Sequence, residues 1–277
     1  MEETNTYRAV RIDDTAEWRM IIYISRNGMS AFLKNEEDPM EPLIVIFSLE
    51  WEKDDIRLLS KIEAAVYDHP QLLDDFSTEI IINTEKSVWV PAKVVDYDAA
   101  GGEEEYREEA DLYNMVYEAA DEDIFMDEIG DKVCLYSLEA GLLPFIRRTL
   151  PGARTWCQQT LAVRRFADQV SDMPRLYVDI REGEADYYGF DGRKLLFAVT
   201  HPWKAKSEIP ERIFSLMEVF RLDKSSTQVM LSGKKDIRAE LMGLLREELN
   251  FVMLTMLPSS ISKCEQPLAV GLALTRR

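Results

Sequence analysis

Hydrophobic and polar residues along the chain predict one order of elements that occurs twice. In the first half, apolar runs rich in β-branched and aromatic residues predict strands, and Asn27-Gly28 between the first two runs predicts a tight hairpin turn. Apolar residues at helical spacing follow the third run. The expected elements are strands Trp18–Ser25, Met29–Lys34 and Leu43–Leu49, a helix Lys53–Tyr67 and a strand Thr78–Asn83.

The second half repeats this order. Its first three apolar runs are separated by the turn dipeptides Glu182-Gly183 and Asp191-Gly192, and helical patterns alternate with apolar runs after them. The expected elements are strands Arg175–Ile180, Glu184–Phe190 and Arg193–Thr200, a helix Ser207–Phe220, a strand Thr227–Gly233, a helix Asp236–Asn250, a strand Phe251–Leu257 and a closing helix Pro267–Leu274.

An acidic segment, residues 96–131, interrupts the first half like an insertion. It contains 15 acidic residues and one basic residue, Arg107. Apolar residues at helical spacing between Tyr106 and Ala120 predict an amphipathic helix, and the acidic run 121–128 is expected to be a solvated helix junction. The elements expected around this segment are an extended stretch Ser87–Val95, a strand Lys132–Leu138, a helix Glu139–Leu150, a strand Ala153–Trp156 and a helix Gln158–Asp168.

Each half therefore runs through three strands joined by turns, then a helix, a strand and a helix. Few folds repeat this order within one chain, so the pattern favours a duplicated unit. We expect an α/β protein with two lobes over residues 1–170 and 171–277. Each lobe would hold a mixed sheet of three antiparallel strands followed by alternating helices and strands. On the pattern alone, a single large α/β domain is the alternative.

The net charge of −18 lies in the first half, because 16 acidic residues balance 16 basic ones from Phe166 onward. A negative field of this size disfavours binding to nucleic acids and to anionic lipid. The acidic segment is expected to be a solvated face or a docking surface for a basic protein partner. No charge-free apolar stretch is long enough to span a membrane and the chain begins without an apolar leader, which favours a cytoplasmic protein with no membrane insertion.

Cysteine and histidine residues give no sign of a metal site or a disulfide framework. Cys134, Cys157 and Cys264 lie far apart and are expected to be small buried side chains, and His69 and His201 have no clustered partners. The chain also lacks the GxxxxGK[ST], GxGxxG, GxSxG and HExxH motifs. These observations exclude the common P-loop, Rossmann, serine hydrolase and zinc chemistries.

Short motifs in the second half resemble those of the actin-like ATPase superfamily. The segment VDIREGEAD is similar to the second phosphate loop of that superfamily, a strand ending in DIGGGTTD, and it keeps Asp179, Gly183 and Asp186. The segment VMLSGKKD resembles the strand-to-helix turn that contacts adenosine, and it keeps Ser232 and Gly233. The ending PLAVGLALTRR is similar to the closing helix of pilus-assembly and cell-division members.

Over nearly its whole length the chain is similar to a family of uncharacterised Bacteroidetes proteins, known only as a domain of unknown function. The resemblance implies a duplicated ribonuclease H-like fold, the actin/hexokinase-like ATPase architecture. It places the first phosphate loop on YISRNGMS, where Tyr23 or Ser25 replaces the usual aspartate. The candidate nucleotide-binding residues are Gly28, Ser30, Asp179, Arg181, Gly183, Ser232 and Gly233.

These loops have lost most of what nucleotide chemistry needs. Backbone N–H groups must approach phosphate closely, which favours glycine, yet Arg181, Glu182 and Glu184 stand in the second loop. A carboxylate beside a phosphate costs on the order of 1 to 4 kcal/mol. Asp179 alone is a poor Mg²⁺ site and is expected to cap a turn. Arg181 would either contact phosphate or form a surface ion pair with one of the two glutamates.

The sequence therefore favours a non-catalytic binding or scaffold protein without cofactor or metal. Its protein partner is unknown and would dock at the cleft between the lobes or on the acidic segment. The alternative is a weak nucleotide-binding protein or ATPase that holds ATP and Mg²⁺ through Asp179, Arg181 and Ser232-Gly233. A small-molecule kinase would need a catalytic aspartate that the sequence does not offer.

Overall fold

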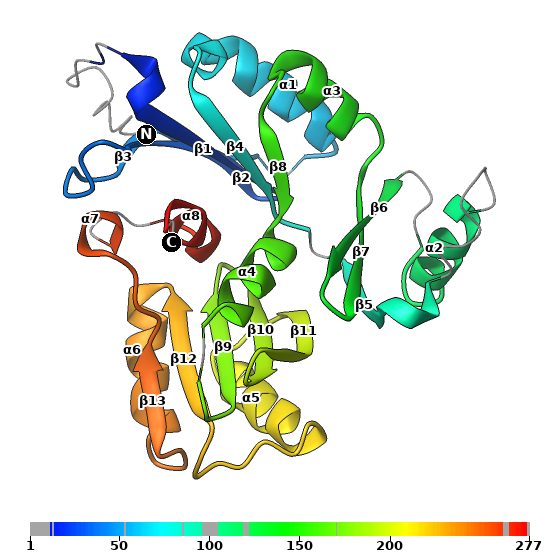
Figure 1. Ribbon diagram of the computed structural model, residues 1–277, viewed down its shortest axis with the longest axis vertical. Coiled ribbons are helices and arrows are strands. Elements are labelled where there is room, and N and C mark those ends of the chain that lie inside the picture. Colours follow the sequence, from blue (N-terminus) through cyan, green and yellow to red (C-terminus); the bar gives the residue numbers. More distant parts are fainter. Residues whose placement is uncertain are drawn as a thin grey trace.

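The computed structural model describes residues 12, 14–52, 54–84, 86–95, 105–118, 122–169, 171–262 and 266–275, with only the backbone for 105–108. The described residues form two five-stranded sheets and one three-stranded sheet. Figure 1 shows the two larger sheets in separate lobes, one above the other, and the small sheet to one side. This is the duplicated two-lobed α/β architecture that the sequence predicts.

The first sheet is mixed, with strand order β3-β2-β1-β4-β8. Strands β1, β2 and β3 are antiparallel, whereas β4 and β8 run parallel to β1. Side chains alternate along β1, so Met20 and Ile22 pack with helices α1 and α3 while Ile21 and Tyr23 face the other lobe. The elements are η2 (Thr15–Glu17), β1 (Trp18–Ser25), β2 (Gly28–Asn35), β3 (Ile44–Glu50), α1 (Leu58–Asp68), η3 (Pro70–Leu73), β4 (Ser77–Ile82), α3 (Leu142–Thr149) and β8 (Arg154–Cys157).

The second sheet repeats this topology in the order β11-β10-β9-β12-β13. Strands β9, β10 and β11 are antiparallel, and β12 and β13 continue in parallel. Leu176, Val178 and Ile180 of β9 pack on the side of helices α5 and α6, and Tyr177 faces the other lobe. The elements are β9 (Arg175–Ile180), β10 (Glu184–Asp191), β11 (Lys194–Pro202), α5 (Glu208–Val219), β12 (Gln228–Gly233), α6 (Lys235–Leu245) and β13 (Phe251–Leu254).

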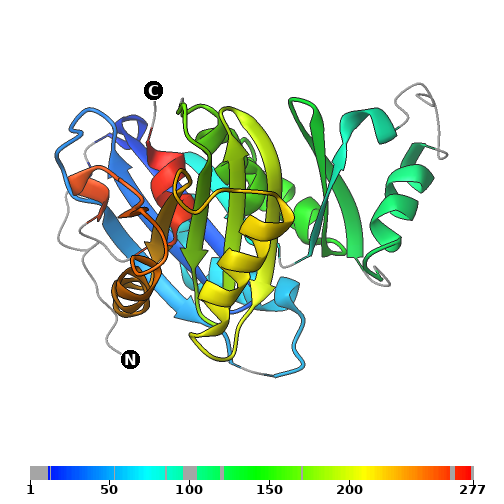
Figure 2. The ribbon, with the colours of Figure 1, turned by 90° about the horizontal axis from the view of Figure 1, so that it is seen from below.

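Two helices lie between the sheets, and each packs on the sheet of the other half of the chain. Helix α4 (Gln158–Ala167) follows the first sheet but packs Ala162 and Phe166 on the second, where the Phe166 ring stacks on Tyr177 at 3.7 Å between centroids. Helix α8 (Leu268–Leu274), which follows the short α7 (Ser259–Ser262), packs Val270 and Ala273 on the first sheet. Figure 1 shows both helices between the two lobes, and Figure 2, seen from below, shows the third sheet to one side of the two larger sheets. The division of the chain at residue 170 stays a prediction.

Residues 122–129 of the acidic segment form a strand of a third sheet. Strands β5 (Ser87–Pro91), β7 (Lys132–Glu139) and β6 (Glu122–Ile129) are antiparallel, and η4 (Ala92–Val94) and α2 (Glu105–Asn114) lie between β5 and β6 in the chain. The prediction of a solvated helix junction over 121–128 was wrong, because residues 122–129 pair with β7 as a strand. Ile124 is buried against Tyr113 of α2, which also hydrogen-bonds to Ser137 at 2.7 Å between hydroxyl oxygens.

Smaller differences have local causes. Helix α1 begins at Leu58 and not at Lys53, because the Asp54 side chain accepts a hydrogen bond from the Ile56 N–H and forms a turn before it. Helix α2 ends at Asn114, and the end of the predicted amphipathic face at Ala120 lies outside the described residues.

Cys134 and Cys157 are free and buried, while Cys264 lies outside the described part of the chain. None of the helices within the described ranges is long and apolar enough to cross a membrane.

Candidate functional site

The segment that resembles a second phosphate loop is a two-residue hairpin turn. Strand β9 ends at Ile180, and the Arg181 N–H donates to the Glu184 carbonyl oxygen at 2.9 Å across the turn. Gly183 has φ +72°, a left-handed conformation that glycine adopts without strain. The turn is therefore closed by its own backbone.

The Arg181 side chain is held between two carboxylates. Its Nη2 lies 2.6 Å from Oδ1 of Asp186 and its Nη1 lies 2.7 Å from Oε1 of Glu184. The arginine and glutamate side chains are each 12% exposed, and the aspartate side chain is fully buried. Burial would lower the pKa of Arg181, but Asp186, Tyr23 and Glu184 raise it well above its usual value. The guanidinium therefore remains charged.

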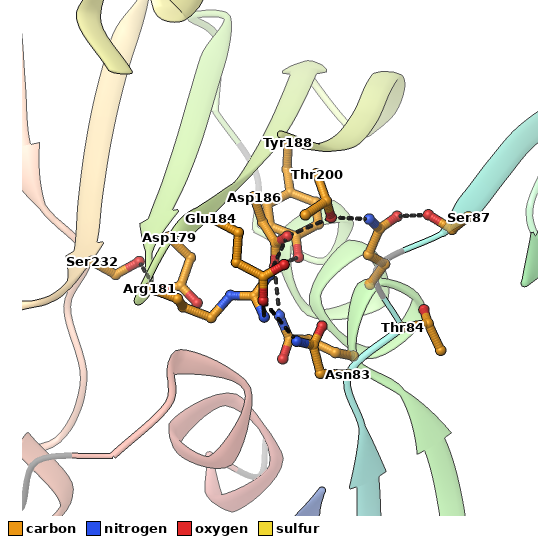
Figure 3. Close-up of polar contacts among 12 residues, drawn as sticks. Asn83, Thr84, Ser87, Asp179, Arg181, Glu184, Asp186, Tyr188, Thr200 and Ser232 are labelled. Atoms are coloured by element: carbon orange, nitrogen blue, oxygen red, sulfur yellow. Dashed lines mark hydrogen bonds and ion pairs between the residues drawn. The ribbon is translucent and has the colours of Figure 1, made fainter. Parts of the chain in front are cut away.

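Asp186 is the centre of a larger hydrogen-bond network. Its carboxylate accepts from Thr200 Oγ1 at 2.6 Å, from Gln158 Nε2 at 2.5 Å and from the Tyr188 hydroxyl at 3.1 Å, besides its ion pair with Arg181. A buried carboxylate is tolerated only when such donors satisfy it. Figure 3 shows how Asp186, Arg181, Tyr188 and Thr200 converge.

Residues of the first lobe complete the network. The Tyr23 hydroxyl on β1 donates to Gln158 Oε1 at 2.7 Å, and Asn83, which follows β4, donates through Nδ2 to Glu184 Oε1 at 3.0 Å. Gln158 is the first residue of α4. We call Tyr23, Asn83, Gln158, Arg181, Glu184, Asp186, Tyr188 and Thr200 the interlobe network.

Gln159 connects the interlobe network to the third sheet. Its amide nitrogen donates to Thr200 Oγ1 at 2.7 Å, while its amide oxygen accepts from Ser87 Oγ at 2.7 Å and from Trp89 Nε1 at 2.8 Å. Both of these donors lie on β5. Helix α4 thus contacts all three sheets through its first two residues and its apolar face.

Asp179 lies beside the network, one strand position before the turn. Ser232 on the neighbouring strand β12 donates to Asp179 Oδ1 at 3.0 Å, so this aspartate bonds across the sheet, whereas the sequence suggested a turn cap. Asp179 is 2% exposed, and burial raises its pKa to about 6, although the charge of Arg181 opposes the shift.

Gly233 is required by backbone packing. Its φ is +90°, and a Cβ atom at this position would lie 1.9 Å from the carbonyl oxygen of Ile180 on β9. The next residue, Lys234, donates its N–H to the same oxygen at 3.0 Å, and its side chain forms an ion pair with Glu182. The retention of this glycine is explained without a nucleotide.

Gly28 and Ser30 lie in the first sheet. Gly28 pairs with Ser25 at the β1–β2 turn, and a Cβ atom there would lie 2.2 Å from the Leu49 carbonyl oxygen. Ser30 Oγ lies 2.9 Å from Ser48 Oγ on β3. Within the described part of the chain, the hydrogen bonds recorded for these residues stay in the first sheet and do not join the interlobe network.

The sequence matches the family model described as "Protein of unknown function (DUF3822)" over residues 8–247. The chain belongs to this family. No curated protein matches it. Among solved structures, it is similar to a protein of unknown function with an actin-like ATPase fold from Bacteroides thetaiotaomicron, with a TM-score of 0.76, 16% identity and coverage of 97% of this chain and 100% of that one.

The chain is also similar to a structure of the PilM–PilN type IV pilus biogenesis complex, with a TM-score of 0.57, 12% identity and coverage of 94% of this chain and 98% of that one. At these identities the likeness concerns the fold alone. This DUF3822 member therefore has the actin-like ATPase fold that its sequence motifs suggest.

The predicted site residues of this DUF3822 member have partners that differ in part from those expected. The expected ion pair of Arg181 with Glu184 is present, but it is buried, and Glu182 pairs with Lys234 instead. Asp186 appeared in the sequence only as a matched motif position, although it accepts most of the hydrogen bonds. Asn83, Gln158 and Thr200 had no sequence signal, since they come from segments far from the motif.

The residues at this place do not fit a magnesium nucleotide. Phosphate would have to replace carboxylates already paired with Arg181, and Glu182 and Glu184 add negative charge beside the turn. Across the described residues, no group of three or more His, Cys, Asp or Glu side chains could hold a metal ion. Most polar groups of the interlobe network instead bond to one another, while the buried Arg181 Nε has no hydrogen-bond partner among the described residues.

Proposed function

We propose that this protein is a non-catalytic binding or scaffold protein of the actin-like ATPase fold, in which the interlobe network takes the place that a nucleotide would have between the lobes. The observation that carries the proposal is the Arg181 guanidinium fixed between Glu184 and Asp186, with Asp186 bonded to Gln158 of the first half. A cytoplasmic location is part of the proposal.

The energetics support the exclusion of nucleotide. Breaking a buried ion pair by removing one partner costs about 3 to 5 kcal/mol, because the other charge stays buried. A phosphate that displaced Asp186 from Arg181 would meet a cost of this order. Since each 1.4 kcal/mol changes a dissociation constant tenfold, a site with a dissociation constant of about 1 μM would weaken to between about 0.1 mM and a few mM.

A protein partner is the second element of the proposal. The PilM–PilN structure shows a protein of similar fold in a complex with another protein. The acidic segment offers a surface of one charge sign, with Asp111 and Glu118 exposed on and just after α2. Such a surface attracts a basic partner and speeds its association.

Thermal unfolding tests the nucleotide part of the proposal. A ligand at 100 times its dissociation constant adds about 2.7 kcal/mol to the free energy of unfolding. We expect the unfolding temperature to stay within about 1 °C when millimolar ATP and Mg²⁺ are added. An increase of several degrees would favour the alternative, a weak nucleotide-binding protein.

Affinity purification from the native cell tests the partner. The variant Asp111→Asn/Glu118→Gln removes charge from the acidic segment without touching strand β6. The matched control, Glu211→Gln/Glu218→Gln, removes the same charge from exposed positions of α5. We expect the first variant to lose a partner that the wild type and the control retain. Equal recovery by all three proteins would contradict docking at the acidic segment.

A further inference from the structure

A cavity of about 310 Å³ lies between the third sheet and the first lobe. One wall is formed by residues of β6 and β7, among them Asp127 and Tyr136, and the opposite wall by residues of α3 and β8, among them Arg147 and Thr155. Ligand cavities commonly lie between domains and measure about 300 to 1,000 Å³. The volume is at the lower end of this range, so the cavity suits a small molecule.

Hydrogen bonds fix the third sheet at two places along β7, one on each side of the cavity residue Tyr136. At the end of β7, the Glu139 carboxylate accepts from the N–H groups of the first two residues of α1 at 2.9 and 3.3 Å. Nearer the start of β7, Cys134 pairs with Trp89 of β5, whose Nε1 donates to Gln159 of α4 at 2.8 Å. The wall that carries Tyr136 is therefore held by the fold, and such preorganisation lowers the cost of binding.

Four polar side chains around the cavity have no partner among the described residues. Neither the Asp127 carboxylate nor the Arg147 guanidinium forms an ion pair or a hydrogen bond in this part of the chain, and the hydroxyl groups of Tyr136 and Thr155 form no hydrogen bond there. Asp127, Tyr136 and Thr155 are half-buried, and Arg147 is exposed. Since buried polar groups usually have partners, these four side chains are available to a ligand.

Asp127 and Arg147 both act on the Tyr136 hydroxyl. Burial and the negative charge of Asp127 raise the pKa of Tyr136 above its usual value, whereas the positive charge of Arg147 opposes this shift. The hydroxyl therefore stays neutral and can donate or accept a hydrogen bond. The cavity thus places an acidic and a basic side chain around one neutral polar group.

The rest of the lining is largely apolar. Leu138 and Leu143 are 6% and 7% exposed, and the Phe125 ring lies 5.9 Å from the Tyr136 ring between centroids. Apolar surface of this kind stabilises a ligand in proportion to the apolar area that it removes from water. The cavity therefore combines an apolar body with two charges of opposite sign.

These surroundings define the charge of the ligand. An anion would meet the carboxylate of Asp127, and a cation would meet the guanidinium of Arg147. An apolar molecule would remove both charges from water without pairing them, which is costly. A ligand with an ammonium group, a carboxylate and an apolar body satisfies all three parts of the lining.

We propose that this cavity binds a free α-amino acid with an apolar side chain. The Asp127 carboxylate accepts hydrogen bonds from the ammonium group, the Arg147 guanidinium donates to the carboxylate, and the apolar side chain packs on Leu138 and Leu143. None of the lining residues belongs to the interlobe network. The site therefore goes beyond the binding or scaffold role proposed above and does not depend on it.

Isothermal titration calorimetry with L-phenylalanine and L-leucine tests this proposal. We expect saturable heat with a dissociation constant below about 1 mM for at least one of them. Two analogues of L-phenylalanine each lack one charge: 2-phenylethylamine has no carboxylate, and 3-phenylpropionate has no ammonium group. Each should bind at least about tenfold more weakly. No saturable heat with either amino acid up to about 10 mM, or analogues that bind as tightly as L-phenylalanine, would overturn the proposal.

Variants of the two charged residues identify the cavity as the site. Asp127→Asn and Arg147→Gln should each weaken the amino acid by about tenfold or more. The matched controls are Glu128→Gln and Arg148→Gln, which remove the same charges at adjacent exposed positions outside the lining and should keep wild-type affinity. Asp127→Asn should not weaken 3-phenylpropionate, because this analogue has no ammonium group to lose. Equal affinity of all four variants would place the amino acid elsewhere and contradict the proposal.

The outcome is distinguishable from that of the nucleotide test. Heat with ATP would count against the absence of nucleotide between the lobes and would leave the amino acid site intact, whereas absence of heat with both amino acids would overturn this site alone. Arg181→Met, which alters the interlobe network, should leave amino acid affinity unchanged. The wild-type titrations decide the proposal even if a variant does not fold.

Discussion

The variant Arg181→Met tests whether the interlobe network stabilises the fold. Methionine keeps the length of the apolar stem of arginine but removes the positive charge between Glu184 and Asp186, both of which are largely buried. Loss of one partner of a buried ion pair costs about 3 to 5 kcal/mol. Because Glu184 and Arg181 retain some exposure and Asp186 keeps three other donors, we expect a loss of about 3 kcal/mol.

Urea unfolding followed by circular dichroism measures this loss in the free energy of unfolding. For a chain of this size, the loss corresponds to a decrease of about 6 to 12 °C in unfolding temperature. A second variant, Arg181→Met/Asp186→Asn, removes the orphaned charge and should recover part of the stability. Lys234→Met is the control, since its ion pair with Glu182 is exposed and should contribute 0 to about 1 kcal/mol. If the free energy of unfolding of Arg181→Met lies within about 0.5 kcal/mol of the wild-type value, the stabilising role of the interlobe network is refuted.

Two further predictions concern retained motif positions. The pKa of Asp179 is about 6 in the folded protein against 3.8 for an ordinary aspartate, so the folded state favours the protonated form; this contribution is full below about pH 4 and is lost as the pH rises through 6. Asp179→Asn should therefore have a free energy of unfolding up to about 3 kcal/mol above that of the wild type at pH 8, with little difference at pH 4, as measured by urea titration. Equal dependence of stability on pH in the two proteins would contradict the raised pKa of Asp179. Gly233→Ala should unfold the protein or lower its unfolding temperature by many degrees, because its Cβ would overlap the Ile180 carbonyl oxygen, whereas Gly192→Ala, at φ +58° with no atom within 4 Å of the added Cβ, should cost only about 1 kcal/mol in thermal scans.

The strands at the centre of each sheet were predictable from local sequence. Trp18–Ser25 and Arg175–Ile180 have the predicted bounds, because apolar side chains fill both faces and turn residues end each strand. Strand β6 was missed. Its apolar run, Ile124–Met126, is short and has acidic residues on both sides, so the segment lacks the alternation of apolar and polar positions that predicts a half-buried strand.

Long-range packing could not be predicted from the sequence. The apolar run of α8 predicts a helix, yet nothing in it indicates that Val270 and Ala273 cover the first sheet and not the second. The third sheet joins β5 to β7 across about 40 residues, with the acidic segment between them. Pairings of this kind depend on the whole fold and have no local signal.

The candidate site was predicted in part. The motif placed Asp179, Arg181 and Gly183 at one turn, and the loss of loop glycines suggested that nucleotide contacts were gone. The sequence could not show that Arg181 points back toward Asp186, because that geometry depends on Gln158 of helix α4, which lies far from the motif in sequence. A buried charge network needs all its members in place, and only the three-dimensional arrangement brings them together.

Isothermal titration calorimetry of the wild-type protein with ATP in the presence of Mg²⁺ tests the central proposal most directly. Because Arg181 is already held by Glu184 and Asp186, we expect no saturable heat at nucleotide concentrations up to about 1 mM. A saturable isotherm with a micromolar dissociation constant, lost in Asp179→Ala, would contradict the proposal and establish a nucleotide site at this turn.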